Sequence, residues 1–187
     1  MKAIFLGLLL LAMSVFPCGT ERWPVKVGTD PGAKQIKMTP QHTTLKALTS
    51  LPQPRKLPND TRVNNTERTI FEIKVEIIKY KSEADEDYHI VVKDEKGNTM
   101  IVEIPSVDCM KGSPFLEFTK NARDHFESKF PTKKSGRIHT LRKPVMATIQ
   151  GVGFFDKIHG QTGVAPNGIE LHPVTKICFE GESCFIP

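Results

Sequence analysis

The chain has 187 residues, with 26 Lys and Arg against 21 Asp and Glu, and 39% of its residues are hydrophobic. A chain of this length is expected to hold one domain with room for an arm. The net charge of +5 is a modest excess that is usual for a solvated surface, so it does not by itself indicate nucleic-acid binding.

Residues 1–19 have the layout of a secretory signal peptide. Lys2 precedes an apolar run over residues 3–11, which is too short to span a bilayer comfortably. Residues 12–14 form the best small-x-small cleavage site, and residues 18–19 form a second one. No later segment is apolar enough to cross a membrane, so we predict a mature chain without a transmembrane segment, secreted or periplasmic.

Export permits disulfides. Cys178 and Cys184 enclose a loop short enough to close a C-terminal hairpin, and we favour that pair. Cys109 is then left free or bonded to Cys18. A lipid anchor on Cys18 is disfavoured because Pro17 fits a lipoprotein signal badly.

Residues 20–68 are rich in Pro and Thr, with little apolar periodicity, and predict an arm wrapped on the domain. Thr44 is expected to cap one short helix, which Pro52 would stop. The apolar residues of that helix are Leu45, Leu48 and Leu51.

From residue 69 the pattern changes to β. Apolar and polar residues alternate over residues 71–77, 88–93 and 99–104, which predicts three strands. Residues 94–98 have the composition of a tight hairpin with glycine in the left-handed conformation.

A helix is predicted next, with Ser113 as its N-cap and Pro114 at its first position. Its apolar stripe is aromatic and indicates core packing. The stripe consists of Phe115, Phe118, Ala122, Phe126 and Phe130. A basic link over residues 133–143 follows the helix.

Val145 opens a fourth predicted strand, in which Gly151 and Gly153 allow a bulge. A fifth strand is expected over residues 168–179. The order β-β-β-α-β-β predicts a mainly β protein with one helix, a five-stranded OB-like Greek-key barrel over residues 69–177 with a tail at 178–187. The alternative is a mixed α+β sandwich.

OB barrels bind ligands over strands 2 and 3 and between the loops that join strands 1 to 2 and 4 to 5. Here those loops are residues 81–87 and 156–167, so two polar segments far apart in the sequence are predicted to meet. The candidate ligand-binding residues are Asp87, His89, Glu103, Asp156, His159, Gln161, Asn167, Glu170 and His172.

Several chemistries remain open for these residues. Glu170 and His172 lie two apart in a strand and point the same way, so they could bind a metal, act as acid and base, or orient one another. His159 is a third candidate metal ligand, or a hydrogen-bonding prop of its loop. His89 and Glu103 are expected to be cross-strand neighbours on a half-exposed face.

The acidic loop is expected to be solvated at Asp85 and Asp87, with cation binding as its functional alternative. Its carboxylates would repel phosphates, and aromatic stacking platforms are absent there, so nucleic acid is a disfavoured partner. The sequence also lacks GxSxG, GxxxxGK[ST], HExxH and paired CxxC motifs.

Three segments resemble a family of small exported bacterial proteins. Residues 87–91, 100–105 and 151–174 match its pattern DxHxV…MIxEIP…GVGFFDxxHGQxGVAPNxIELHPV. The resemblance extends from about residue 23 to residue 177, and the tail is an addition to the pattern. It implies bacterial export and a compact β domain, but no activity is established for this family, so it transfers no catalytic residue.

The favoured function is therefore a non-catalytic exported binding module that holds a glycan or another cell-envelope component between residues 81–87 and 156–167. The rival is a metal-assisted hydrolase of the nuclease or phosphodiesterase kind, in which a divalent metal activates water. A third alternative is a structural corner whose polar residues satisfy backbone groups. No cofactor is evident in the sequence; a divalent metal is the one candidate.

Overall fold

The computed structural model describes residues 18–130 and 136–182. Residues 1–17 of the predicted signal peptide (residues 1–19) lie outside these ranges. Cys184 does too, so its pairing with Cys178 stays a prediction. Within the described part, no helix combines the length and the apolar character needed to cross a membrane.

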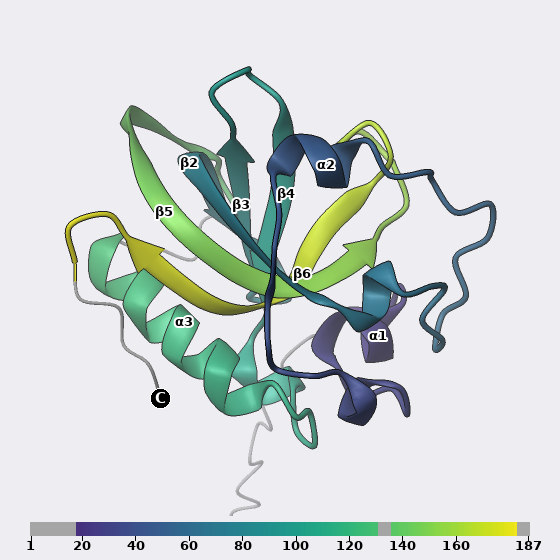
Figure 1. The fold of residues 1–187 in the computed structure, drawn as a ribbon. Helices are drawn as coiled ribbons and strands as arrows, with labels where there is room; N and C mark the ends of the chain where they lie inside the picture. The colour runs from purple at the N-terminus through teal and green to yellow at the C-terminus, as the bar shows by residue number, and fades with distance from the viewer. Residues whose placement is uncertain (1–17, 131–135, 183–187) are drawn as a thin grey trace, which may run out of the picture.

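The structure is mainly β, as predicted, and its sheet closes on itself through hydrogen bonds (Figure 1). Its strands are β1 (Gln41–His42), β2 (Ile70–Ser82), β3 (Tyr88–Lys93), β4 (Thr99–Ile104), β5 (His139–Phe155) and β6 (Ile169–Phe179). They pair in the order β1-β2-β3-β4-β6-β5, and β5 pairs again with β2. β1–β2 and β4–β6 are parallel pairs and the others are antiparallel.

Three predictions about the strands can be compared directly with the structure. The hairpin before β4 has Gly97 at φ +83°, as expected. Register shifts occur at Gly151 and Gly153, which confirms the bulge. A Cβ on Gly153 would lie 2.5 Å from the carbonyl oxygen of Thr66, so the glycine lets the arm approach. β5 begins at His139, earlier than predicted, and absorbs part of the basic link.

The long helix α3 (Leu116–Lys129) packs along β6 (Figure 1). Phe126 and Phe130 enter the main core, as the aromatic stripe predicts. The predicted cap is wrong by two residues, because Phe115 occupies the N-cap position. The Ser113 hydroxyl instead accepts a hydrogen bond from the Phe115 amide in the preceding turn.

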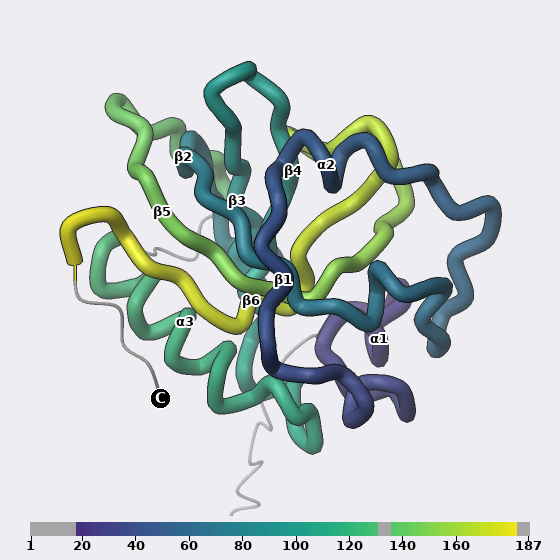
Figure 2. The backbone as a smooth tube through the Cα atoms, viewed as in Figure 1, coloured from purple at the N-terminus to yellow at the C-terminus, as the bar shows by residue number. Residues whose placement is uncertain are grey.

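The arm crosses the outside of the sheet and carries more structure than its sequence indicates (Figure 2). It contains α1 (Trp23–Val27), α2 (Leu45–Thr49) and the 3-10 turns η1 (Ala33–Gln35) and η2 (Thr66–Arg68); a further turn, η3 (Val107–Cys109), follows β4. The Thr44 hydroxyl caps α2, as predicted. The unpredicted α1 leads into a second apolar cluster, in which Val27 packs with Ile70 and Phe115.

Candidate functional site

The candidate site lies on the outer face of β3, β4 and β6. Alternate residues of these strands enter the core, and the residues between them point away from it. His89 and Glu103 are paired across β3 and β4, as predicted. Glu170 and His172 come from β6, which pairs with β4. The polar side chains therefore gather where three strands meet.

This outer face is buried. Five polar residues on it are each at most 6% exposed: Asp87, His89, Glu103, Glu170 and His172. The expectations of a half-exposed face and of a solvated Asp87 are therefore wrong. The physical reason is that the arm and the loop between β5 and β6 cover the face.

Two backbone carbonyls from these covering segments hold the two imidazoles. The Nδ1–H of His172 donates to the carbonyl of Lys26, in α1, over 3.0 Å. The Nε2–H of His89 donates to the carbonyl of Thr162, in the loop, over 2.9 Å. Because a carbonyl can only accept, each bond fixes which ring nitrogen faces the cluster.

Both of these inward-facing nitrogens are aimed at the carboxylate of Glu103. His89 Nδ1 lies 3.1 Å from Oε1, and His172 Nε2 lies 3.0 Å from Oε2. His172 Nε2 is also 3.6 Å from Asp87 Oδ2, although it makes no aligned hydrogen bond with either carboxylate. The other oxygen of Asp87 accepts a hydrogen bond from the Ser106 amide. Glu103 is thus the centre of the cluster.

Burial and charge shift the pKa values in opposite directions. Burial alone would lower the pKa of His172, but the carboxylates of Asp87 and Glu103 raise it to about 10. Burial raises the pKa of Asp87 to about 6, even though His172 opposes that shift. Burial would also raise the pKa of Glu103, but His172 and His89 hold it well below its usual value. Near neutral pH the imidazole of His172 is therefore protonated and lies between the carboxylates of Asp87 and Glu103.

A second group of charges adjoins the first. Lys26 Nζ lies 3.2 Å from Asp156 Oδ2 and 5.5 Å from the ring centre of Phe154. Burial would lower the pKa of Lys26, but the carboxylates of Glu103, Asp156 and Glu170 raise it. Burial and the neighbouring carboxylates raise the pKa of Glu170 well above its usual value, and its Oε2 is buried without a hydrogen-bond partner.

Three candidate residues lie outside both groups of charges. His159 is exposed. The side chain of Gln161 accepts a hydrogen bond from the His159 amide and so closes its own loop. The amide of Asn167 donates to the carbonyls of Leu48 and Leu51, each over 2.9 Å, and ties the loop to the end of α2.

Two further charged residues of the arm carry no local signal in the sequence. Lys26 supplies both a carbonyl and an ammonium group to the cluster. Arg22 is fully buried, and its Nη1 and Nη2 lie 2.7 and 2.9 Å from the carboxylate of Glu67. Its guanidinium also stacks 4.7 Å from the ring centre of Phe154. The apolar Trp23-Pro24-Val25 segment lies between them, and Val25 is fully buried.

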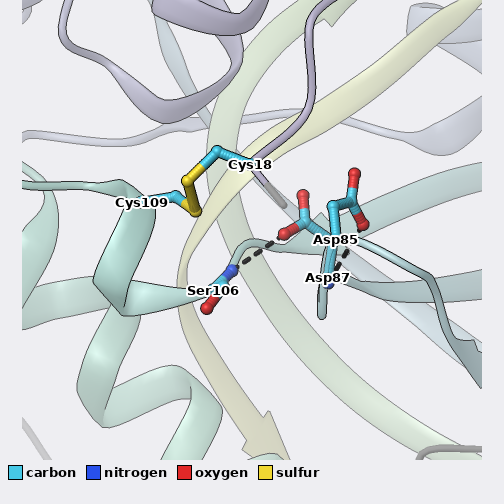
Figure 3. The surroundings of a disulfide bond; sticks show 5 residues. All are labelled: Cys18, Asp85, Asp87, Ser106 and Cys109. Carbon is cyan, nitrogen blue, oxygen red and sulfur yellow. Dashed lines mark hydrogen bonds between the residues drawn. A yellow bond between two sulfur atoms is a disulfide. The ribbon is translucent and has the colours of Figure 1, made fainter. Parts of the chain in front are cut away.

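A disulfide fastens the start of the arm beside the acidic loop (Figure 3). It joins Cys18 to Cys109, which are 91 residues apart, and realises one of the two alternatives left open for Cys109. Figure 3 places it near Asp85 and Asp87. The bond is compatible with an extracellular location, and a mature chain that contains it must retain Cys18.

Two groups of side chains among the described residues could hold a metal ion. One consists of Asp87, Glu103 and His172, and the other of Glu83, His89 and Glu103. Of the predicted metal ligands, His172 belongs to the first group, whereas His159 and Glu170 belong to neither.

An open hollow of about 490 Å³ adjoins this face. Residues 18–20 and residues 81–85 form most of its lining. Glu83 belongs both to the lining and to the second potential metal group. A solvent-accessible hollow therefore lies next to the buried cluster.

Comparisons with known proteins assign no relationship: no family model matches the chain, and a search of the curated proteins gives no match. The functional argument consequently depends on the geometry of the site.

Proposed function

We propose that this chain is an exported, non-catalytic binding module with an OB-like barrel, and that its ligand binds between residues 81–87 and 156–167. The observation that supports the proposal is that both segments lie close to His89: its Nδ1 is 3.7 Å from Glu83 Oε1, and its Nε2–H donates to the carbonyl of Thr162. The ring of strands and the parallel β4–β6 pair support the barrel description.

The hollow is the accessible part of the proposed site on the side of residues 81–87, because the arm covers the cluster itself; residues 18–20 form the opposite part of its lining. Thr20, Lys81, Glu83 and Asp85 line the hollow and supply both donors and acceptors. Such a lining suits a ligand rich in hydroxyl groups, so the proposed ligand is a glycan or another cell-envelope component. The carboxylates make nucleic acid a disfavoured partner.

The binding test is a titration of isotope-labelled protein with soluble peptidoglycan fragments, in which NMR measures the amide chemical shifts. The expected shifts are confined to residues 18–20, 81–87 and 156–167, and the double variant Glu83→Gln, Asp85→Asn should weaken them. Lys46→Gln is the matched control, since Lys46 lines a separate groove. Shifts centred on that groove, or no shifts at saturating fragment, would overturn the proposal.

A metal-assisted hydrolase of the nuclease or phosphodiesterase kind is the second candidate. The observation in its favour is that Glu83 connects the hollow with a group that could hold a metal. Hydrolysis of bis(p-nitrophenyl) phosphate with added Mn²⁺ or Zn²⁺ separates the two functions. If the wild type hydrolyses the substrate and His89→Gln does not, the result supports the hydrolase. If the wild type hydrolyses it no faster than the metal ion alone, the result supports the binding module.

Export and membership of the bacterial family that the motifs resemble are part of the same proposal. Expression in a bacterial host, with the intact mass of the product measured, tests export. The expected product lacks the leader but retains Cys18. A cytoplasmic product that begins at Met1 would contradict it.

A further inference from the structure

We propose that Asp87, Glu103 and His172 form a buried site for one divalent transition-metal ion of the zinc class. The inference rests on the proposed function and extends it, because it names a metal ion that binds to the same face of the sheet. The site belongs to the cluster under the arm, next to the open hollow.

The spacing of the three side chains fits one small ion. Their ligand atoms lie within 4.8 Å of one another. His172 Nε2 is 3.0 Å from Glu103 Oε2 and 3.6 Å from Asp87 Oδ2. Ligands about 2.0–2.2 Å from a tetrahedral zinc ion stand roughly 3.4 Å apart, so little movement is needed to admit the metal.

The imidazole of His172 is already oriented as a metal ligand. Its Nδ1–H donates to the carbonyl of Lys26, an arrangement in which a backbone carbonyl typically fixes a ligating histidine. Nε2 is therefore the nitrogen that faces the carboxylates, and it is fully buried without an aligned hydrogen bond. Such a nitrogen needs a proton or a metal ion between itself and the two carboxylates.

The carboxylates are oriented in the same way. The Ser106 amide donates to Oδ1 of Asp87 and leaves Oδ2 facing His172. His89 contacts Oε1 of Glu103 and leaves Oε2 facing His172. Each ligand thus has a partner that holds it, which is the outer shell expected of a built site.

Charge and donor type select the class of ion. Two carboxylates and a neutral imidazole carry a charge that a divalent cation balances. Imidazole nitrogen suits zinc and other transition metals, whereas calcium requires six to eight oxygen ligands. Three protein ligands also leave a coordination position open, as in catalytic zinc sites.

The neighbouring group of Glu83, His89 and Glu103 fits less well. The side chain of Glu83 is 30% exposed, and its Oε1 already lies 2.7 Å from Lys81 Nζ. In this assignment His89 is a positioning residue that holds Glu103, and Glu83 is not a ligand. Glu83→Gln is therefore the matched control.

The test uses the full mature chain with its disulfide, refolded with Zn²⁺ or Co²⁺, desalted and analysed for metal content. The expected result is one ion per chain and, for Co²⁺, visible absorption bands of a nitrogen and oxygen site. His172→Gln should abolish the bands, and Asp87→Asn, which is nearly isosteric, should weaken affinity at least tenfold. Glu83→Gln should leave both unchanged, whereas His89→Gln should weaken affinity by roughly 10–100-fold.

Two results would overturn the inference: no retained metal in the folded wild-type protein, or loss of the metal in Glu83→Gln with retention in Asp87→Asn. If His172→Gln fails to fold, Asp87→Asn still decides the question. Repeating the peptidoglycan titration in EDTA separates the two proposals. Fragment binding without any metal site would overturn only the inference, and a metal site without fragment binding would overturn only the glycan ligand.

Discussion

The imidazole of His172 donates its Nδ1–H to the carbonyl of Lys26, a residue 146 positions earlier in the chain, over 3.0 Å. The same lysine reaches Asp156 with its ammonium group. The arm is therefore a structural component of the polar cluster, since both its backbone and a side chain complete interactions that start on the sheet.

The disulfide should hold this arm in place. The double variant Cys18→Ser, Cys109→Ser is expected to lower the free energy of unfolding by about 3 kcal/mol, because it removes the cross-link of a long loop from the unfolded chain. Urea denaturation measures the loss, and hydrogen exchange should show faster opening at residues 18–27. Unchanged exchange there would show that the arm is held without the bond.

The buried ion pair of Arg22 and Glu67 provides a second test of the arm. Arg22→Met leaves the Glu67 carboxylate buried without its cation, so the free energy of unfolding should fall by roughly 3–5 kcal/mol. Lys74→Met is the control, because the side chains of Lys74 and Glu180 are each 62% exposed. That change should cost less than about 1 kcal/mol in the same urea titration. Equal losses in the two variants would contradict the argument.

Local patterns predicted most of the strands and part of the site. Alternation located the strands, and the short hairpin after β3 set the register that pairs His89 with Glu103. The Thr44 cap was predictable for the same reason, since its signal lies within one turn of α2.

The burial of the cluster was not predictable, because it depends on contacts between distant segments. The helix that brings Lys26 to His172 has five residues, too few to show a period. The partner of Cys109 was equally undetermined, since spacing alone does not give disulfide connectivity. Asp87 consequently looked like a solvated loop residue, although it is buried beside His172.

The raised pKa of His172 predicts how stability changes with pH. This pKa is about 10 in the folded chain against 6.5 for a free histidine, so the stabilising contribution is complete below pH 6.5 and is lost as the pH rises towards 10. The free energy of unfolding of the wild type should approach that of His172→Gln between pH 7 and pH 10. Urea titrations of both proteins across this range measure the difference.

The contribution of Asp87 to the free energy of unfolding also falls as the pH rises, but over a lower pH range. Its pKa is about 6 in the folded chain against 3.8 for a free aspartate, so its contribution is lost as the pH rises through 6. Above pH 7 Asp87 therefore adds little to the change in stability, although His89, whose pKa is also raised, still contributes to it. A gap between wild type and His172→Gln that stays constant from pH 7 to pH 10 would show that the imidazole is not held as a cation.

Asn167 should behave as a structural residue, in contrast to its prediction as a ligand contact. Asn167→Ala removes two hydrogen bonds to the carbonyls of Leu48 and Leu51, so we expect a loss of about 2–3 kcal/mol in the free energy of unfolding. Affinity for peptidoglycan fragments should not change in the fraction that remains folded. Gln161→Ala is the control from the same loop, with an expected loss below about 1 kcal/mol because its hydrogen bonds are exposed. Weakened fragment binding by Asn167→Ala at unchanged stability would instead assign this residue to the ligand.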